Sequence, residues 1–148
     1  GEGKRIDAHG VDADVKDVVT EENLTAMVSF VKAVAKVTKS IIVISGSIDL
    51  VSDENRCYCI YNGRSEMSRI TGTGCQLSGL IASFITANPD HMLEATAAAV
   101  IDMGLAGEIA YGHLAPFEGN ATYRNRIIDA ICLMEADVLE KGARYEVR

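Results

Sequence analysis

The chain has 148 residues, of which 48% are hydrophobic, and 21 acidic against 14 basic residues give it a formal net charge of −7. This length corresponds to about one domain, and the apolar fraction is enough to bury a core. The acidic balance argues against non-specific binding to nucleic acid or anionic membranes, since both need basic patches. No apolar run reaches the roughly 18 residues of a membrane span, and residues 1–10 lack the apolar stretch of a signal peptide, so we expect a cytoplasmic protein.

The first half of the sequence predicts a helix followed by three short strands. Residues 1–20 are polar and irregular, and apolar residues then recur at helical spacing from 24 to about 39. One stripe of this helix should therefore pack on a sheet. The run 41–44 is apolar throughout, which is typical of a strand buried on both faces. Residues 48–52 and 56–61 predict two further strands, joined by a polar turn.

The second half predicts mostly helices. Residues 67–71 should approach a glycine-rich turn as a strand, and the helix behind the turn should cover 75–87 and end before Asn88-Pro89. The alanine-rich stretch 91–111 predicts a long helix that neighbouring elements can approach closely. A loop then leads to a last amphipathic helix over 123–141, which a glycine ends.

The most informative segment is the glycine-rich run from Ile70 to Cys75, which leads into an apolar helix. Gly72 and Gly74 let the backbone turn tightly, and the unpaired N–H groups and positive dipole end of the helix then point at the turn. A phosphate group would suit such a site. Cys75 lies at the helix start, where the same field lowers a thiol pKa from its ordinary value of ~8.5, so it is a candidate base or nucleophile. By itself, such a turn is common and indicates little.

Five blocks of the sequence, in the right order, resemble those of the hydroxyethylthiazole kinase family, the thiamine-salvage member of the ribokinase-like superfamily. They are Gly10-Val11-Asp12-Ala13; the nucleotide-binding turn from Ile44 to Asp49; the short strand Val51-Ser52-Asp53; the anion-hole run from Ile70 to Cys75 with Leu77-Ser78 after it; and the final turn and helix at 119–123 and 127–130. In this family, a cysteine replaces the usual aspartate of the superfamily at the anion hole. Five ordered blocks argue against coincidence.

The resemblance implies the C-terminal portion of a ribokinase-like three-layer α/β/α fold with a mostly parallel central sheet. It runs along nearly all of residues 1–148, yet it covers only the C-terminal part of the family's single kinase domain. The family's first half carries substrate contacts, acidic residues near the metal and an arginine that touches ATP. We therefore expect a fragment that needs its N-terminal half. The resemblance also implies a homotrimer with active sites between subunits.

The reaction implied by the resemblance is ATP-dependent phosphorylation of the primary alcohol of 4-methyl-5-(2-hydroxyethyl)thiazole, with Mg²⁺ bridging the phosphates. Backbone amides of Gly72, Thr73, Gly74 and Cys75 would neutralise charge on the transferring phosphoryl group. Gly72 also aligns with the family's substrate-contacting glycine. Cys75 would position the alcohol and accept its proton late in transfer. Ser45 aligns with a threonine that touches ATP, whereas the magnesium ligands stay unknown.

Three other interpretations of the chain stay open. The first is another small-alcohol kinase of the ribokinase-like group. The second is a non-catalytic piece that only assembles with a kinase partner. The third is a thiol acyltransferase or hydrolase, in which Cys75 would need a base such as His91 or His113. These two histidines and His9 are scattered without any informative spacing, which favours structural roles.

The remaining candidate ligands favour structural roles as well. Asp49 and Asp53 lie in turns, where short acidic side chains usually cap backbone N–H groups, with metal ligation as the alternative. Cys57 and Cys59 are two residues apart, which places both on one face of a strand and does not match a zinc site. Cys132 lies in an apolar stretch and is expected to be a small core residue.

Overall fold

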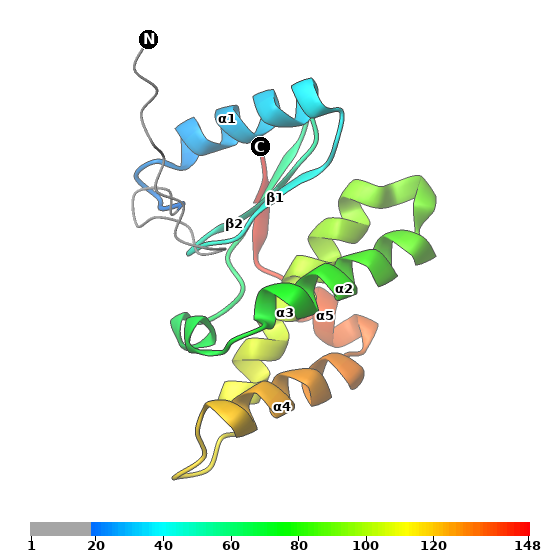
Figure 1. Cartoon of the computed structure of the whole chain (residues 1–148). Helices are drawn as coiled ribbons and strands as arrows, with labels where there is room; N and C mark the ends of the chain where they lie inside the picture. The colour runs from blue at the N-terminus through cyan, green and yellow to red at the C-terminus, as the bar shows by residue number, and fades with distance from the viewer. Residues whose placement is uncertain (1–18) are drawn as a thin grey trace.

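The computed structural model describes residues 19–148, which form an α/β structure in three layers (Figure 1). One helix, α1, packs on one face of a small sheet; the other face packs mainly on α3, and α4 packs on the far side of α3. The elements in chain order are α1 Leu24–Thr38, β1 Ile42–Ile44, β2 Asp49–Ser52, β3 Cys57–Ile60, the 3₁₀ helix η1 Ser65–Arg69, α2 Thr73–Ala87, the 3₁₀ turn η2 Pro89–His91, α3 Met92–Gly112, α4 Asn120–Cys132, α5 Ala136–Gly142 and β4 Tyr145–Val147. The block Gly10 to Ala13 and His9 lie outside the described residues.

The sheet has the order β1-β2-β3-β4, and every strand pair in the described part of the chain is antiparallel. The expected mostly parallel sheet is therefore not what these residues form. Short turns join β1 to β2 and β2 to β3, and such turns can connect only antiparallel neighbours, since a parallel connection needs a crossover of about a dozen residues or more. Ile44 pairs with Leu50, and Asp49 pairs with Ile60, so the C-terminal ends of the strands β1 and β3 lie at the same end of the sheet.

The predicted placement of Cys57 and Cys59 on one face of a strand is confirmed. Cys57 and Cys59 are both fully buried on the α1 side, together with Leu50. Burial raises the pKa of the Cys59 thiol to about 12, so this thiol stays neutral and serves packing. The strand β1 was expected to be buried on both faces, yet its residues are only half-buried, because it is the edge of the sheet in the described chain.

Two predicted elements are wrong. The segment 67–71 is not a strand: residues 67–69 belong to η1, and Ile70, whose backbone is extended, packs into a helical cluster instead of the sheet. The predicted last helix 123–141 is two helices, α4 and α5. Cys132 ends α4 and is exposed, so its expected place in the core is also wrong. The strand β4 was not predicted, although polar and apolar residues alternate from Arg144 to Arg148.

The long small-residue helix is confirmed as α3, the most deeply buried of the described helices. Its N-terminal half packs on the sheet through side chains such as Leu93 and Val100, and its C-terminal half packs on α2 and α4 through Met103 and Ala106. None of the described helices is long and apolar enough to cross a lipid bilayer. One charged side chain lies in this packing, that of Asp102, which is 3% exposed and whose Oδ1 has no hydrogen-bond partner among the described residues.

Replacing Asp102 with asparagine should stabilise the protein at neutral and alkaline pH. Burial raises the pKa of Asp102 from 3.8 to about 6, so the fold prefers the protonated carboxyl, and this contribution to stability is lost as the pH rises through about 6. Asp102→Asn should therefore raise the free energy of unfolding by up to about 3 kcal/mol at pH 8 and change it little at pH 4. Chemical unfolding at both pH values measures this, with the exposed Asp90→Asn as control. A gain of equal size at the two pH values would contradict the assignment.

Candidate functional site

The glycine turn forms an open, positively polarised end on α2. Gly72 has the left-handed φ of 96° that favours glycine, and its carbonyl oxygen accepts the first helical hydrogen bond from the Gln76 N–H at 3.0 Å. The N–H groups of Thr73, Gly74 and Cys75 have no acceptor within residues 19–148. They are the orphan donors that every helix start carries, and the helix dipole adds positive charge there. The turn can therefore bind an anion through backbone groups alone.

The sequence-predicted residues 72–75 are brought together as expected, with small differences in detail. The helix begins at Thr73 rather than at Cys75, and the Thr73 hydroxyl donates to the Ile70 carbonyl oxygen at 3.4 Å. A Cβ atom built on Gly72 or on Gly74 would meet nothing within 4 Å, so the space beside the turn is open. The Cys75 thiol is exposed on the same turn. The turn that carries the donors and the thiol is thus accessible to a ligand.

Neither candidate histidine is placed to serve Cys75 as a base. His91 ends η2, beyond the C-terminal end of the 15-residue α2, so it lies on the order of 20 Å from the helix start. His113 caps the C-terminus of α3 and lines a separate hollow of about 340 Å³ between α3, α4 and α5. A general acid or base for a thiol hydrolase is therefore not assembled by the described residues.

The predicted nucleotide-binding turn lies between β1 and β2, at the end of the sheet where the chain also leaves β3. Ser45 is exposed there, and no hydrogen bond joins it to the glycine turn in the part of the chain that the structure describes. The capping role of Asp49 is confirmed, because its Oδ1 accepts the Gly46 N–H at 2.8 Å. Burial raises the pKa of Asp49 to about 6, although this hydrogen bond acts in the opposite direction.

The second turn acid is engaged in the same way. Asp53 Oδ1 accepts the backbone N–H groups of Asn55 at 2.7 Å and Arg56 at 2.6 Å, which confirms its capping role. Within residues 19–148, no three His, Cys, Asp or Glu side chains gather closely enough to hold a metal ion. The described residues thus offer backbone donors for an anion and no assembled cation site.

A second helix start lies next to the glycine turn. The side-chain amide of Asn120, the first residue of α4, donates to the Arg69 carbonyl oxygen at 3.1 Å, three residues before Gly72. Both α2 and α4 pack on α3, and their N-terminal ends lie at the same end of the helical layer (Figure 1). Two helix N-termini therefore flank the segment that leads into the turn, and both favour negative charge.

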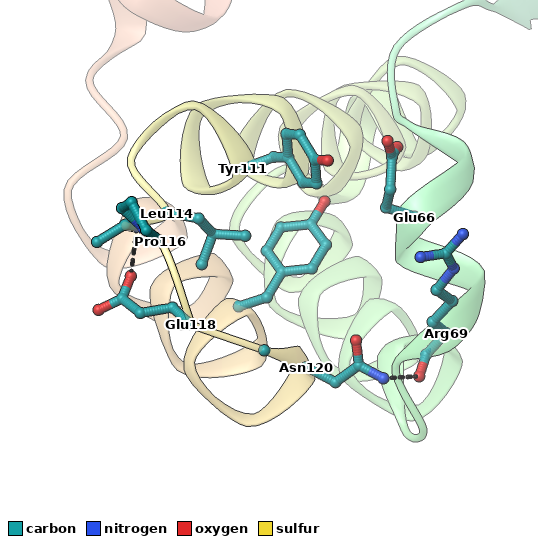
Figure 2. A pocket seen from close by; sticks show the side chains of 10 residues that line it. Glu66, Arg69, Tyr111, Leu114, Pro116, Glu118 and Asn120 are labelled. Carbon is teal, nitrogen blue, oxygen red and sulfur yellow. Dashed lines mark hydrogen bonds between the residues drawn. The ribbon is translucent and has the colours of Figure 1, made fainter.

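A pocket of about 520 Å³ opens beside this segment (Figure 2). Glu66 and Arg69 line one side and Tyr111 and Leu114 face them, with Asn120 at the end near the glycine turn. The full lining is Glu66, Arg69, Tyr111, Leu114, Ala115, Pro116, Glu118, Gly119, Asn120 and Tyr123. The volume falls in the range of small-molecule sites.

Of the two charged side chains on one side of this pocket, Glu66 has an ion-pair partner and Arg69 has none among the described residues. Hydrogen bonds from Arg64 lower the pKa of Glu66 to about 2, so this carboxylate is neutralised by its neighbour. Arg69, by contrast, has no ion-pair partner among residues 19–148. It is the free positive charge nearest in sequence to the glycine turn. Sequence patterns did not indicate Arg69 or Tyr111, and the one available signal was a lone basic residue directly before Ile70.

Comparison with known proteins gives a consistent result. The chain matches the family model described as "Hydroxyethylthiazole kinase family" over residues 2–137. A curated hydroxyethylthiazole kinase of Clostridium acetobutylicum is 47% identical over 137 residues, which cover 93% of this chain and 50% of that protein. Hydroxyethylthiazole kinase 2 of Clostridium botulinum strain 657 is 35% identical over 142 residues, which cover 96% of this chain and 51% of that protein.

A solved structure, that of the hydroxyethylthiazole kinase protein from Pyrococcus horikoshii OT3, is similar as well. The TM-score is 0.76 at 26% sequence identity, over 86% of this chain and 48% of that one. The chain thus spans about half the length of the relatives that it matches.

Proposed function

The chain belongs to the hydroxyethylthiazole kinase family, and we propose that it forms the C-terminal part of a single ribokinase-like kinase domain. The proposed reaction transfers the γ-phosphoryl group of ATP to the primary alcohol of 4-methyl-5-(2-hydroxyethyl)thiazole. In this reaction, the oxygen of the alcohol forms a bond to phosphorus, the bond from phosphorus to the β-γ bridging oxygen of ATP breaks, and the alcohol loses a proton.

The observation that carries this proposal is the set of free N–H groups at the start of α2. Thr73, Gly74 and Cys75 point their amides to the open side of a turn that Gly72 makes possible. Phosphoryl transfer needs little covalent chemistry from the protein, so catalysis comes from positioning and from donors fixed where charge develops. The unpaired guanidinium of Arg69 adds positive charge on the pocket side of the same segment.

Cys75 has a specific part in the proposal. Its exposed thiol shares the first turn of α2 with the free amides, so an alcohol bound beside the phosphate would lie within reach of it. We assign Cys75 the task of holding the alcohol and accepting its proton late in transfer, as the superfamily's aspartate would do. Ser45, on the turn between β1 and β2, is assigned an ATP contact in the complete site.

The donors of the glycine turn fit ATP phosphates, whereas the described acids do not fit a magnesium site. Asp49 and Asp53 already accept backbone N–H groups in their own turns. We therefore assign Mg²⁺ its general chemistry, neutralisation of phosphate charge, and no ligand on residues 19–148. The proposal also includes a cytoplasmic homotrimer with active sites between subunits, completed by the part of the domain that this chain does not cover.

The test is ADP formation with Mg-ATP and 4-methyl-5-(2-hydroxyethyl)thiazole. The chain is assayed alone and after mixing with the part of the Clostridium acetobutylicum relative that it does not cover, with intact masses recorded. We expect turnover in the mixture that depends on the thiazole alcohol. Turnover with other small alcohols in its place would favour the second candidate, a different kinase of the ribokinase-like group. No turnover with any alcohol would refute the proposal.

The thiol assignment predicts different effects for two cysteines that are both exposed. Cys75→Ala should lower kcat by about 10²-fold, the lower end for a positioned acid or base, whereas Cys132→Ala at the end of α4 should leave it unchanged. Cys75→Asp should keep more activity than Cys75→Ala, since a carboxylate can accept the same proton. Initial rates of ADP release measure all three variants. Equal rates for Cys75→Ala and the unmodified protein would remove Cys75 from the mechanism.

A further inference from the structure

A short segment, residues 62–70, carries the chain from the end of β3 to the glycine turn and lies along the C-terminal half of α3. Its first residue, Asn62, is buried, and a Cβ atom on Gly104 would lie 2.8 Å from the carbonyl carbon of Asn62. Further along, Met67 lies over Gly107, where a Cβ atom would collide with its side chain. Two glycines one helical turn apart thus leave the room that this segment occupies.

The N-terminal end of the segment, at Asn62 and Gly63, is held by one carboxylate, that of Glu108 on α3. Its Oε1 accepts the Gly63 N–H at 2.6 Å, and Arg144 donates to both of its oxygens, at 2.7 and 3.0 Å. Asn62 donates to the Gly142 carbonyl oxygen at 3.0 Å and accepts the Arg144 backbone N–H at 2.8 Å. The end of β3, α3 and the link between α5 and β4 therefore meet at this side chain.

These hydrogen bonds are of the strong kind. The Glu108 side chain is 20% exposed, and although burial raises the pKa of its carboxyl, the hydrogen bonds from Arg144 and Gly63 outweigh this and lower it. The group is charged at neutral pH, and charge-assisted hydrogen bonds are roughly twice as strong as neutral ones. Truncation of Glu108 would leave the partly buried Gly63 N–H without its acceptor and would release the Arg144 guanidinium, whose side chain is 53% exposed, to water.

The far end of the segment is attached as well. The Arg64 guanidinium carbon lies 4.1 Å from the centroid of the Tyr111 ring, and Asn120 donates to the Arg69 carbonyl oxygen at 3.1 Å. Only two residues separate Arg69 from Gly72. The segment is thus in contact with α3 from Asn62 to Arg64, Met67 and Ile70, and it ends directly before the glycine turn.

From this arrangement we infer that Glu108 is a positioning residue of the phosphate site: it fixes where segment 62–70 leaves the sheet, and so where the N–H groups of the glycine turn point. The inference rests on the proposed function, which gives that turn its role. Arg144 acts with Glu108, because it ties the C-terminal strand β4 to the same carboxylate.

The inference is tested on the chain labelled with ¹⁵N-glycine, through backbone amide signals in NMR spectra. Glu108→Ala should shift or broaden the signals of Gly72 and Gly74 as well as that of Gly63, which loses its acceptor. Gly79, in the middle of α2, serves as the internal reference and should not move. If Gly63 moves and the two turn glycines do not, the carboxylate acts only locally and the inference is wrong.

A matched control lies on the same helix. Glu94, near the N-terminal end of α3, forms an ion pair with Arg56 at 2.7 Å. Glu94→Ala should leave the signals of Gly72 and Gly74 in place, and an equal response to both variants would overturn a specific role for Glu108. Should Glu108→Ala fail to fold, Arg144→Gln weakens the same cluster while keeping the bond to Gly63. It should move the two turn signals in the same direction but by less, and unmoved signals would contradict the inference.

Kinetics separate this inference from the proposed function. In the active mixture with the complementary part of the Clostridium acetobutylicum relative, Glu108→Ala should lower kcat by about 10- to 100-fold, the size expected for a misplacement of about 1 Å, with little change in KM for ATP. An unchanged kcat would contradict the inference. An unmodified protein without kinase activity would refute the proposed function, whereas the glycine signals would still decide whether Glu108 positions the turn.

Discussion

The structure depends on the close approach of one short segment, residues 62–70, to the backbone of α3. At Gly104 and Gly107 the helix has no side chain, and the space is taken by Asn62 and Met67. The segment has no ladder hydrogen bonds of its own, so its position depends on this contact and on Glu108 at its start. The contacts of Arg64 with Tyr111 and of Arg69 with Asn120 hold its far end. The glycine turn follows this segment directly, so the contact contributes to its position relative to the sheet.

The candidate site follows from that constraint and from helix electrostatics. The helices α2 and α4 pack on the same helix, and their N-terminal ends lie on one side of it. The free amides of residues 73–75 and the side chain of Arg69 belong to this end of the helical layer. A protein with an overall charge of −7 thereby presents local positive polarity to an anion. The site needs few charged side chains, because the backbone supplies most of the donors.

Local patterns in the sequence were sufficient for the elements whose cause is local. Helical periodicity gave α1, and the glycine run gave the start of α2 within two residues. The parts that sequence patterns missed depend on distant contacts: β4 pairs with β3, and Asn62 binds groups about 80 residues further along the chain. The false strand before the glycine turn has the same cause, since no local pattern shows that Met67 and Ile70 pack against α3 instead of in the sheet. The exposure of Cys132 depends on where α4 ends.

The most direct measurement of the central claim is a titration of the ¹⁵N-labelled chain with Mg-ATP, followed through backbone amide signals. The account predicts saturable shifts that are largest at Thr73, Gly74 and Cys75, with smaller shifts along 69–72 and none at the α1 face of the sheet. Saturable shifts elsewhere with these three amides unmoved would contradict it, because the phosphates would then bind away from the start of α2.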